Sequence, residues 1–144
     1  MNNYTLSEKI DLIIDFVTRE HDEMSREEAE KNDLTLKAIQ DGFLSMRDNN
    51  YKITAKGLTF LEPLRKQMIL ELIEYVEPKK NGRTISEIVN WFKDKYVAGN
   101  DEDVLILIDY IIWNVDKLGY KAKKKIYNSD NRIVILKQDI SLKI

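Results

Sequence analysis

The fold is decided by residues 41–58, which read DGFLSMRDNNYKITAKGL. Gly42 follows a run of helical periodicity and is typical of the left-handed residue that ends a helix. Two short segments, residues 43–46 and 51–54, flank a polar turn at residues 47–50, as the strands of a hairpin do. Thr54 can then cap another helix. This stretch predicts the order helix, hairpin, helix.

Helical patterns also flank this stretch on both sides. Two capping boxes, in which Ser or Thr is followed three residues later by Glu, precede it: Thr5 with Glu8, and Ser25 with Glu28. They predict a helix at residues 6–20 and two short helices within residues 26–41, the second of them capped by Asp33. No opening strand is visible before these helices. Pro63 is expected to interrupt the helix that follows Thr54, because proline lacks a backbone N–H, and a further helix is predicted at residues 64–76.

The same order of elements returns in the second half of the chain. A short extended segment at residues 83–85 follows a turn by composition, and Ser86 with Glu87 opens a helix that ends near Gly99. The acidic run at residues 101–103 suits the positive end of a new helix, expected from Asp101 to Leu118. Gly119 ends that helix. A second hairpin is predicted from residues 120–127 and 132–137, separated by the turn at residues 128–131.

Two of these stretches resemble a known class of proteins. Gly42-Phe43-Leu44, the hairpin and Ile53-Thr54-Ala55-Lys56-Gly57-Leu58 resemble the passage from wing to last helix in winged-helix regulators of the MarR, ArsR and PadR types. Arg83-Thr84-Ile85-Ser86-Glu87-Ile88 is similar to the strand and helix start of a helix-turn-helix. The resemblance implies a mainly α fold with small β-hairpins (α+β), built as two winged-helix-like units at residues 1–63 and 64–144. It also implies DNA binding and transcription regulation.

The composition excludes several kinds of chemistry. The chain of 144 residues has no cysteine and one histidine, so it lacks thiolate or His-pair metal sites, and His21, which stands beside Glu20, Asp22 and Glu23, is typical of a helix end rather than of a Ser-His-Asp relay. Its five glycines are scattered singly, which leaves no phosphate loop. We therefore expect no catalytic residues, no metal and no cofactor, and we do not expect an enzyme.

Sequence features also bear on location. The absence of cysteine favours a reducing compartment, and the first residues do not resemble a signal peptide. The longest apolar run, residues 104–108, is cut by Asp109 and is too short for a membrane span. A cytoplasmic protein without a membrane partner is the expectation.

The second predicted hairpin carries most of the concentrated positive charge. The chain as a whole has a net charge of −2, which does not favour strong non-specific binding to nucleic acid. Residues 117–132, however, include one anion, Asp130, and six cations. The cations are Lys117, Lys121, Lys123, Lys124, Lys125 and Arg132. Such a hairpin can lie along DNA phosphates. Lysines that protect an edge strand against unwanted pairing explain the pattern equally well.

The two predicted reading helices differ in character. In the first unit, Thr35, Lys37 and Gln40, with Arg47 and Lys52 on the hairpin, are candidates for contact with double-stranded DNA. In the second unit, the helix predicted between Asp101 and Leu118 is apolar nearly all round and its exposed remainder is partly acidic. Such a helix is buried or lies in an interface, with the other unit, a second copy in a homodimer or another protein.

Two functions from different classes follow from this sequence. The first is a DNA-binding winged-helix regulator, anchored by Lys121, Lys123, Lys124, Lys125 and Arg132. The second is a protein-interaction module, which tandem winged helices resembling condensin-associated and membrane-sorting adaptor proteins would imply. The lysines favour the first function, whereas the acidic pI and the apolar helix favour the second.

Overall fold

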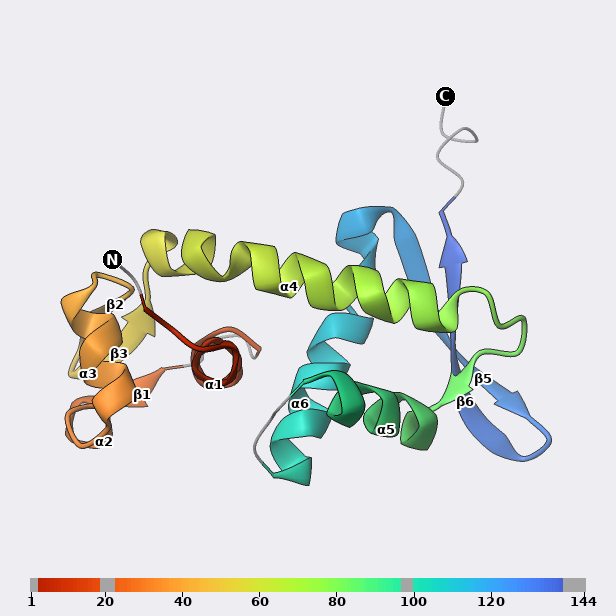
Figure 1. Cartoon of the computed structure of the whole chain (residues 1–144), viewed down its shortest axis with the longest axis horizontal. Coiled ribbons are helices and arrows are strands. Elements are labelled where there is room, and N and C mark those ends of the chain that lie inside the picture. The colour runs from red at the N-terminus through yellow and green to blue at the C-terminus, as the bar shows by residue number, and fades with distance from the viewer. Residues whose placement is uncertain (1–2, 19–22, 97–99, 139–144) are drawn as a thin grey trace. The chain divides into compact units, whose positions relative to one another are not determined.

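A computed structural model describes residues 3–18, 23–96 and 100–138 of the chain. The first half contains α1 (Leu6–Phe16), β1 (Met24–Ser25), α2 (Arg26–Ala29), α3 (Asp33–Gln40), β2 (Leu44–Arg47) and β3 (Asn50–Ile53) (Figure 1). The second half contains α4 (Ala55–Val76), β4 (Arg83–Thr84), α5 (Ile85–Lys95), α6 (Asp101–Ile112), the 3₁₀ helix η1 (Val115–Leu118), β5 (Tyr120–Tyr127) and β6 (Asp130–Lys137).

The same topology occurs twice. In each half a helix leads into a short strand, two helices and a hairpin, and the sheets have the strand orders β1-β3-β2 and β4-β6-β5. This confirms the predicted fold class, mainly α with small β-hairpins (α+β). The first half does have an opening strand, in which Met24 pairs with Tyr51. Two residues are too short to show the alternation by which strands are recognised in a sequence.

Both hairpins close through turns of two residues rather than the predicted four. Asp48 and Asn49 in the first turn, and Asn128 and Ser129 in the second, all have positive φ. Two consecutive residues of this kind make the turn that matches the twist of a β-ribbon. The tight turn extends pairing to the ends of both strands, so that Tyr127 lies opposite Asp130.

Two helices of the first half differ in extent from the prediction. α1 ends at Phe16, earlier than expected, where the Thr18 hydroxyl donates to the Ile14 carbonyl at 3.0 Å. α4 is continuous through Pro63, contrary to the expected interruption. The proline is exposed, while Leu61 and Leu64 beside it are buried. We attribute the continuity to this packing, which outweighs the roughly 3 kcal/mol that a proline costs inside a helix.

Two helix ends of the second half also differ. α5 begins at Ile85 because Thr84, not Ser86, caps it: Glu87 donates its backbone N–H to the Thr84 hydroxyl, and Thr84 donates its own to the Glu87 carboxylate. The helix predicted from Asp101 to Leu118 is two helices, α6 and η1. Asn114 breaks it by donating from its side chain to the Tyr110 carbonyl at 2.6 Å, in competition with the backbone ladder.

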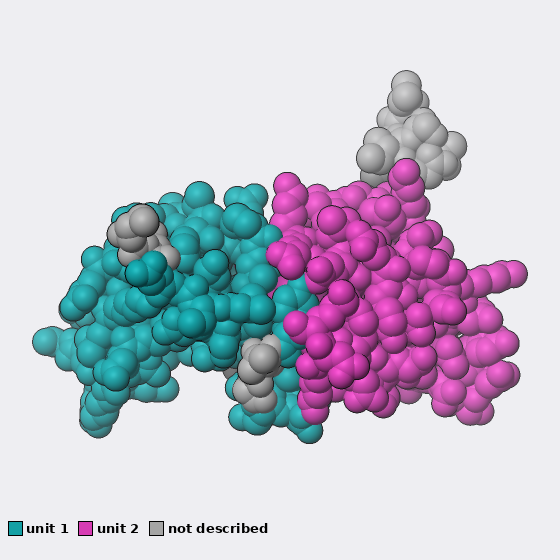
Figure 2. All heavy atoms as spheres, viewed as in Figure 1, with its two compact units in different colours: residues 1–64, 96–107 teal, residues 65–95, 108–144 magenta. Residues whose placement is uncertain are grey.

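The chain divides into two compact units, each with its own buried side chains. The first unit comprises residues 1–64 and 96–107, and the second comprises residues 65–95 and 108–144 (Figure 2). The sequence-based boundary between residues 63 and 64 lies beside this break within α4, but residues 96–107 group with the first unit. The largest fully buried side chains include Ile10, Ile13 and Leu61 in the first unit, and Met68, Leu72, Ile88, Phe92, Ile111 and Ile135 in the second. Among the described helices, none combines the length and apolar character needed to cross a bilayer.

Candidate functional site

The β5–β6 hairpin places its cations on two different faces. Lys121, Lys123 and Lys125 are exposed and lie opposite Leu136, Val134 and Arg132 in the antiparallel ladder. Directly opposed residues share a face, so these three lysines and Arg132 form one surface, which we call the lysine face. Successive lysines along it are two positions apart, about 6.8 Å of strand. The alternation predicted from the sequence therefore holds.

The lysine face is partly held in place by its neighbours. Lys125 Nζ donates to Asn81 Oδ1 at 3.0 Å, and Arg132 Nη1 donates to the Gly82 carbonyl at 3.4 Å. Arg132 also lies 3.8 Å from the Asp130 carboxylate and 5.4 Å from the Tyr127 ring centroid. Asp130 is the only anion between residues 117 and 132, and it is thus occupied by Arg132. Within the part of the chain that the structure describes, Lys121 and Lys123 have no ion-pair partner and remain available to an anionic one.

β5 is also the outer strand of its sheet, in the order β4-β6-β5. Exposed lysines on an outer strand discourage pairing with a strand of another chain. The edge-protection interpretation therefore applies to the same residues as the phosphate-binding one.

The candidate residues of the first unit do not form a free basic surface. Thr35 was predicted to contact DNA, and the structure corrects this. It is 2 % exposed and its hydroxyl lies 3.9 Å from the Met24 sulfur, so it does not face a DNA groove. Its backbone N–H donates to Asn32 Oδ1 at 2.9 Å, which places Thr35 in the capped first turn of α3. Lys52 lies 3.3 Å from the Glu23 carboxylate. Of the five candidates, Gln40 and Arg47 are the exposed ones.

Lys37 is tied to the N-terminal segment. Its ammonium donates to the Asn3 carbonyl, lies 3.8 Å from the Glu8 carboxylate and sits 4.1 Å from the Tyr4 ring centroid. Tyr4 itself donates to Asp41 at 2.7 Å, and burial raises the pKa of its hydroxyl well above the ordinary value. Lys37 thus serves local structure in this unit, and a phosphate would have to compete with these contacts.

The surface beside α1 in the first unit is acidic. Asp15, Glu23, Glu28 and Asp103 line a shallow hollow of about 230 Å³ with Ile14, Met24 and Ile106. Burial, with the charge of Asp103 second, raises the pKa of Asp11 nearby. Within residues 3–18, 23–96 and 100–138 no group of three or more His, Asp or Glu side chains is arranged to hold a metal ion. This hollow repels phosphate.

α6 buries one side and exposes another. Val104, Leu107, Ile108, Ile111 and Ile112 are at most 2 % exposed, as expected for an apolar helix. Leu105 and Trp113, however, are 47 % and 44 % exposed. The segment is therefore not buried all round, and of the places that the sequence pattern allowed, the core is not the one that Trp113 occupies.

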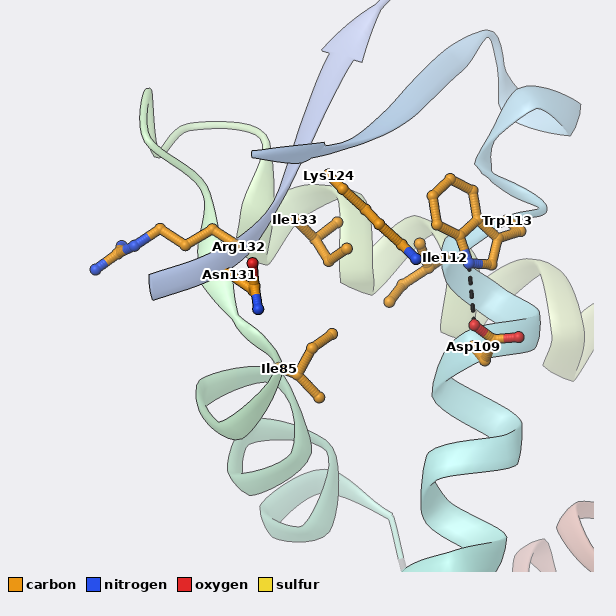
Figure 3. A pocket seen from close by; sticks show the side chains of 8 residues that line it. All are labelled: Ile85, Asp109, Ile112, Trp113, Lys124, Asn131, Arg132 and Ile133. Atoms are coloured by element: carbon orange, nitrogen blue, oxygen red, sulfur yellow. Dashed lines mark hydrogen bonds between the residues drawn. The ribbon is translucent and has the colours of Figure 1, made fainter. Parts of the chain in front are cut away.

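Lys124 lies on the opposite side of the hairpin from the lysine face, in a pocket of the second unit. It pairs with Ile133 across the ladder, and both line a space of about 410 Å³ with six other residues: Ile85, Asp109, Ile112, Trp113, Asn131 and Arg132. Figure 3 shows the Lys124 side chain extending into the pocket toward Ile112 and Trp113, whereas the Arg132 guanidinium points away. On the far wall, Trp113 Nε1 donates to Asp109 Oδ1 at 3.0 Å.

The capping box at the start of α5 holds the Ile85 wall of this pocket. The Thr84 backbone N–H donates to Glu87 at 2.9 Å, and this bond lowers the pKa of the Glu87 carboxyl. Sequence reasoning did not identify the pocket, although the alternation of β5 had already separated Lys124 from its neighbours. The remaining walls come from segments up to 48 residues apart, Ile85 and Ile133, which no local pattern connects.

Comparison with known proteins adds no relatives. No family model, curated protein or solved structure matches this chain.

Proposed function

We propose that this chain is a DNA-binding winged-helix protein that holds duplex DNA mainly through its phosphates and acts in transcription regulation. The observation that carries the proposal is the lysine face, where Lys121, Lys123 and Lys125 are exposed in one row. Cations in such a row neutralise neighbouring phosphates and release counterions, which gives affinity without reading bases.

We expect little base reading from α3 or from α6, the second of the two helices that follow the short strand in each half. α3 turns Thr35 inward, and α6 exposes Leu105 and Asp109 rather than donors suited to base edges. The acidic hollow beside α1 also keeps that part of the first unit away from a polyanion. We therefore propose that contact is concentrated on the second hairpin, with Gln40 and Arg47 as the accessible residues of the first unit.

A salt-dependent titration with random-sequence duplex DNA tests this proposal. Replacing Lys121, Lys123 and Lys125 together with Ala is expected to weaken binding to all sequences alike and to lower the log-log salt slope by up to about 2.7. Lys124→Ala is the matched control, because it removes one cation from the same strand but from the other face. Absence of binding by the wild-type chain at about 50 mM salt, or an equal effect of the control, contradicts the proposal.

The second candidate function is a protein-interaction module without DNA contact. It is favoured by the half-exposed Trp113, which follows the end of α6 and donates to the Asp109 carboxylate on the exposed side of that helix. An exposed tryptophan is typical of the anchor residues of protein interfaces. In this case the lysines are edge protection, and the duplex titration shows no binding at any salt concentration.

A further inference from the structure

We infer that the pocket between the inner face of the β5–β6 hairpin and the ends of α5 and α6 is a binding site for a small aromatic monocarboxylate. Its volume, about 410 Å³, falls in the range of small-molecule sites, which is about 300–1,000 Å³. Such sites combine apolar walls with a few polar groups that fix the orientation of the ligand. This pocket has both.

The apolar walls come from Ile85, Ile112, Ile133 and Trp113. Ile112 and Ile133 are 2 % and 4 % exposed and form a fixed floor, while Ile85 and Trp113 are 37 % and 44 % exposed at its mouth. The hydrogen bond from Trp113 Nε1 to Asp109 fixes the direction of the indole ring. A planar ring can stack or pack edgewise against an indole held in this way, and it buries apolar surface of both.

The charge that selects the ligand is the Lys124 ammonium. It extends into the pocket (Figure 3), and it has no ion pair or hydrogen bond with any residue that the structure describes. Arg132, the other cation of the lining, is turned to Asp130 and Gly82 instead. A carboxylate next to Lys124 gains a charge-assisted hydrogen bond, while the ring that carries it reaches the apolar floor.

Asp109 sets the limit on ligand charge. Its carboxylate lies on the side of the pocket toward which the Lys124 side chain extends (Figure 3), so every anionic group on the ligand meets a like charge there, and a second one has no further cation to offset it because the Arg132 guanidinium points away. Monocarboxylates are therefore preferred over dicarboxylates and over nucleotide phosphates. This site is separate from the lysine face, and it does not depend on DNA binding.

Indole resonances provide the test, because the chain has two tryptophans and only Trp113 lines the pocket. Benzoate is titrated into the ¹⁵N-labelled full chain, and Trp91→Phe assigns the two indole N–H signals. We expect the Trp113 signal to move saturably while the Trp91 signal stays in place. Benzamide, which lacks the charge, and phthalate, which carries two, are expected to bind about tenfold more weakly than benzoate.

Two neighbouring lysines give a matched pair of variants. Lys124→Met keeps a long unbranched side chain, one atom shorter, but removes its charge, and it is expected to weaken benzoate binding about tenfold. Lys123→Met makes the same change one residue away on the lysine face and should leave benzoate binding unchanged. The inference is overturned if benzoate does not move the Trp113 signal, or if both variants lose affinity equally. Since no DNA is present, failure here leaves the phosphate-contact proposal standing, and failure of the duplex titration leaves this one standing.

Discussion

Lys124 lies directly opposite Ile133 in the β5–β6 ladder, and Ile133 is 4 % exposed. Lys124 thus lies on the same face of the hairpin as Ile133, whereas its neighbours Lys123 and Lys125 lie on the other face. The run therefore divides into an outer row that suits a polyanion and one inner ammonium that suits a single small anion. Each can be removed without the other, which makes the two proposed activities separable by substitution.

The Asp109 carboxylate offers a way to tune the inner site. Asp109→Asn keeps an acceptor for the Trp113 indole but removes the negative charge from the side of the pocket toward which Lys124 extends (Figure 3). We expect benzoate to bind about two- to fivefold more tightly, because a like charge several ångströms away costs roughly 0.5–1 kcal/mol. The gain should shrink as salt screens the charge. Titrations at low and high salt check this, and weaker binding by the variant would show that Asp109 contributes to the ligand site directly.

The capping residue of α5 is Thr84, and this assignment has a matched control in Ser86. Thr84→Ala should lower the free energy of unfolding by about 1 kcal/mol, since the Glu87 backbone N–H loses its acceptor. Ser86→Ala, at the position that the sequence pattern suggested, should change it little. Urea unfolding of both variants at neutral pH decides the assignment, and a larger loss in Ser86→Ala would reverse it.

The pH dependence of this cap follows from the Glu87 carboxylate. Hydrogen bonding from Thr84 lowers its pKa on folding, so the folded state favours the charged form. A lowered pKa gives stability that is present above the unfolded value of about 4.3 and is lost as the pH falls through the folded value. Glu87→Gln should therefore be less stable than the wild type at pH about 7 but close to it at pH about 3. A constant difference at both pH values would contradict the role of the charge.

The pKa of the Asp11 carboxyl shifts in the opposite direction from that of Glu87 on folding. Burial, then Asp103 and Glu8, raise its pKa, so the folded state holds the proton to a higher pH than the unfolded chain does. Its ionisation destabilises the fold as the pH rises above the unfolded value of about 3.9. Asp11→Asn is expected to raise Tm at neutral pH and to leave it unchanged near pH 3. Glu62→Gln, which removes the same charge from an exposed position on α4, should not reproduce this gain.

The sequence predicted what local patterns encode. Helical periodicity, capping boxes and the glycine at position 42 gave the order of elements in both units, and the alternation of β5 gave the outer row of lysines. It missed what depends on distant contacts. β1 exists because Met24 pairs with Tyr51, and Thr35 is buried because of the packing around α3.

The sequence did not predict the pocket for the same reason. Its walls come from the start of α5, the end of α6 and the hairpin, and none of these segments shows the space between them by itself. The break of the long apolar helix at Asn114 was likewise invisible, because it results from a single side chain bonding to the Tyr110 carbonyl. That break ends α6 one residue before Trp113, on the rim of the pocket.

Ile111 and Trp113 separate the buried side of α6 from the exposed one, although the sequence pattern placed both in the core or an interface. Ile111 is 0 % exposed, so Ile111→Asp puts an unpaired charge in the core at a cost of several kcal/mol, comparable to the stability of a whole domain. Trp113 is 44 % exposed. Trp113→Asp should cost about 1 kcal/mol or less, which includes a few tenths from its like charge with Asp109 one turn away.

Thermal unfolding followed by circular dichroism, with molar mass from light scattering, measures both effects. We expect Ile111→Asp to abolish the cooperative transition and Trp113→Asp to keep it with a Tm a few degrees lower. If Trp113→Asp also unfolds the chain, the indole is part of the core. If the wild type has the mass of a dimer and Trp113→Asp halves it, the outward side of α6 is covered by a second copy. That result would favour the interaction-module function over DNA binding.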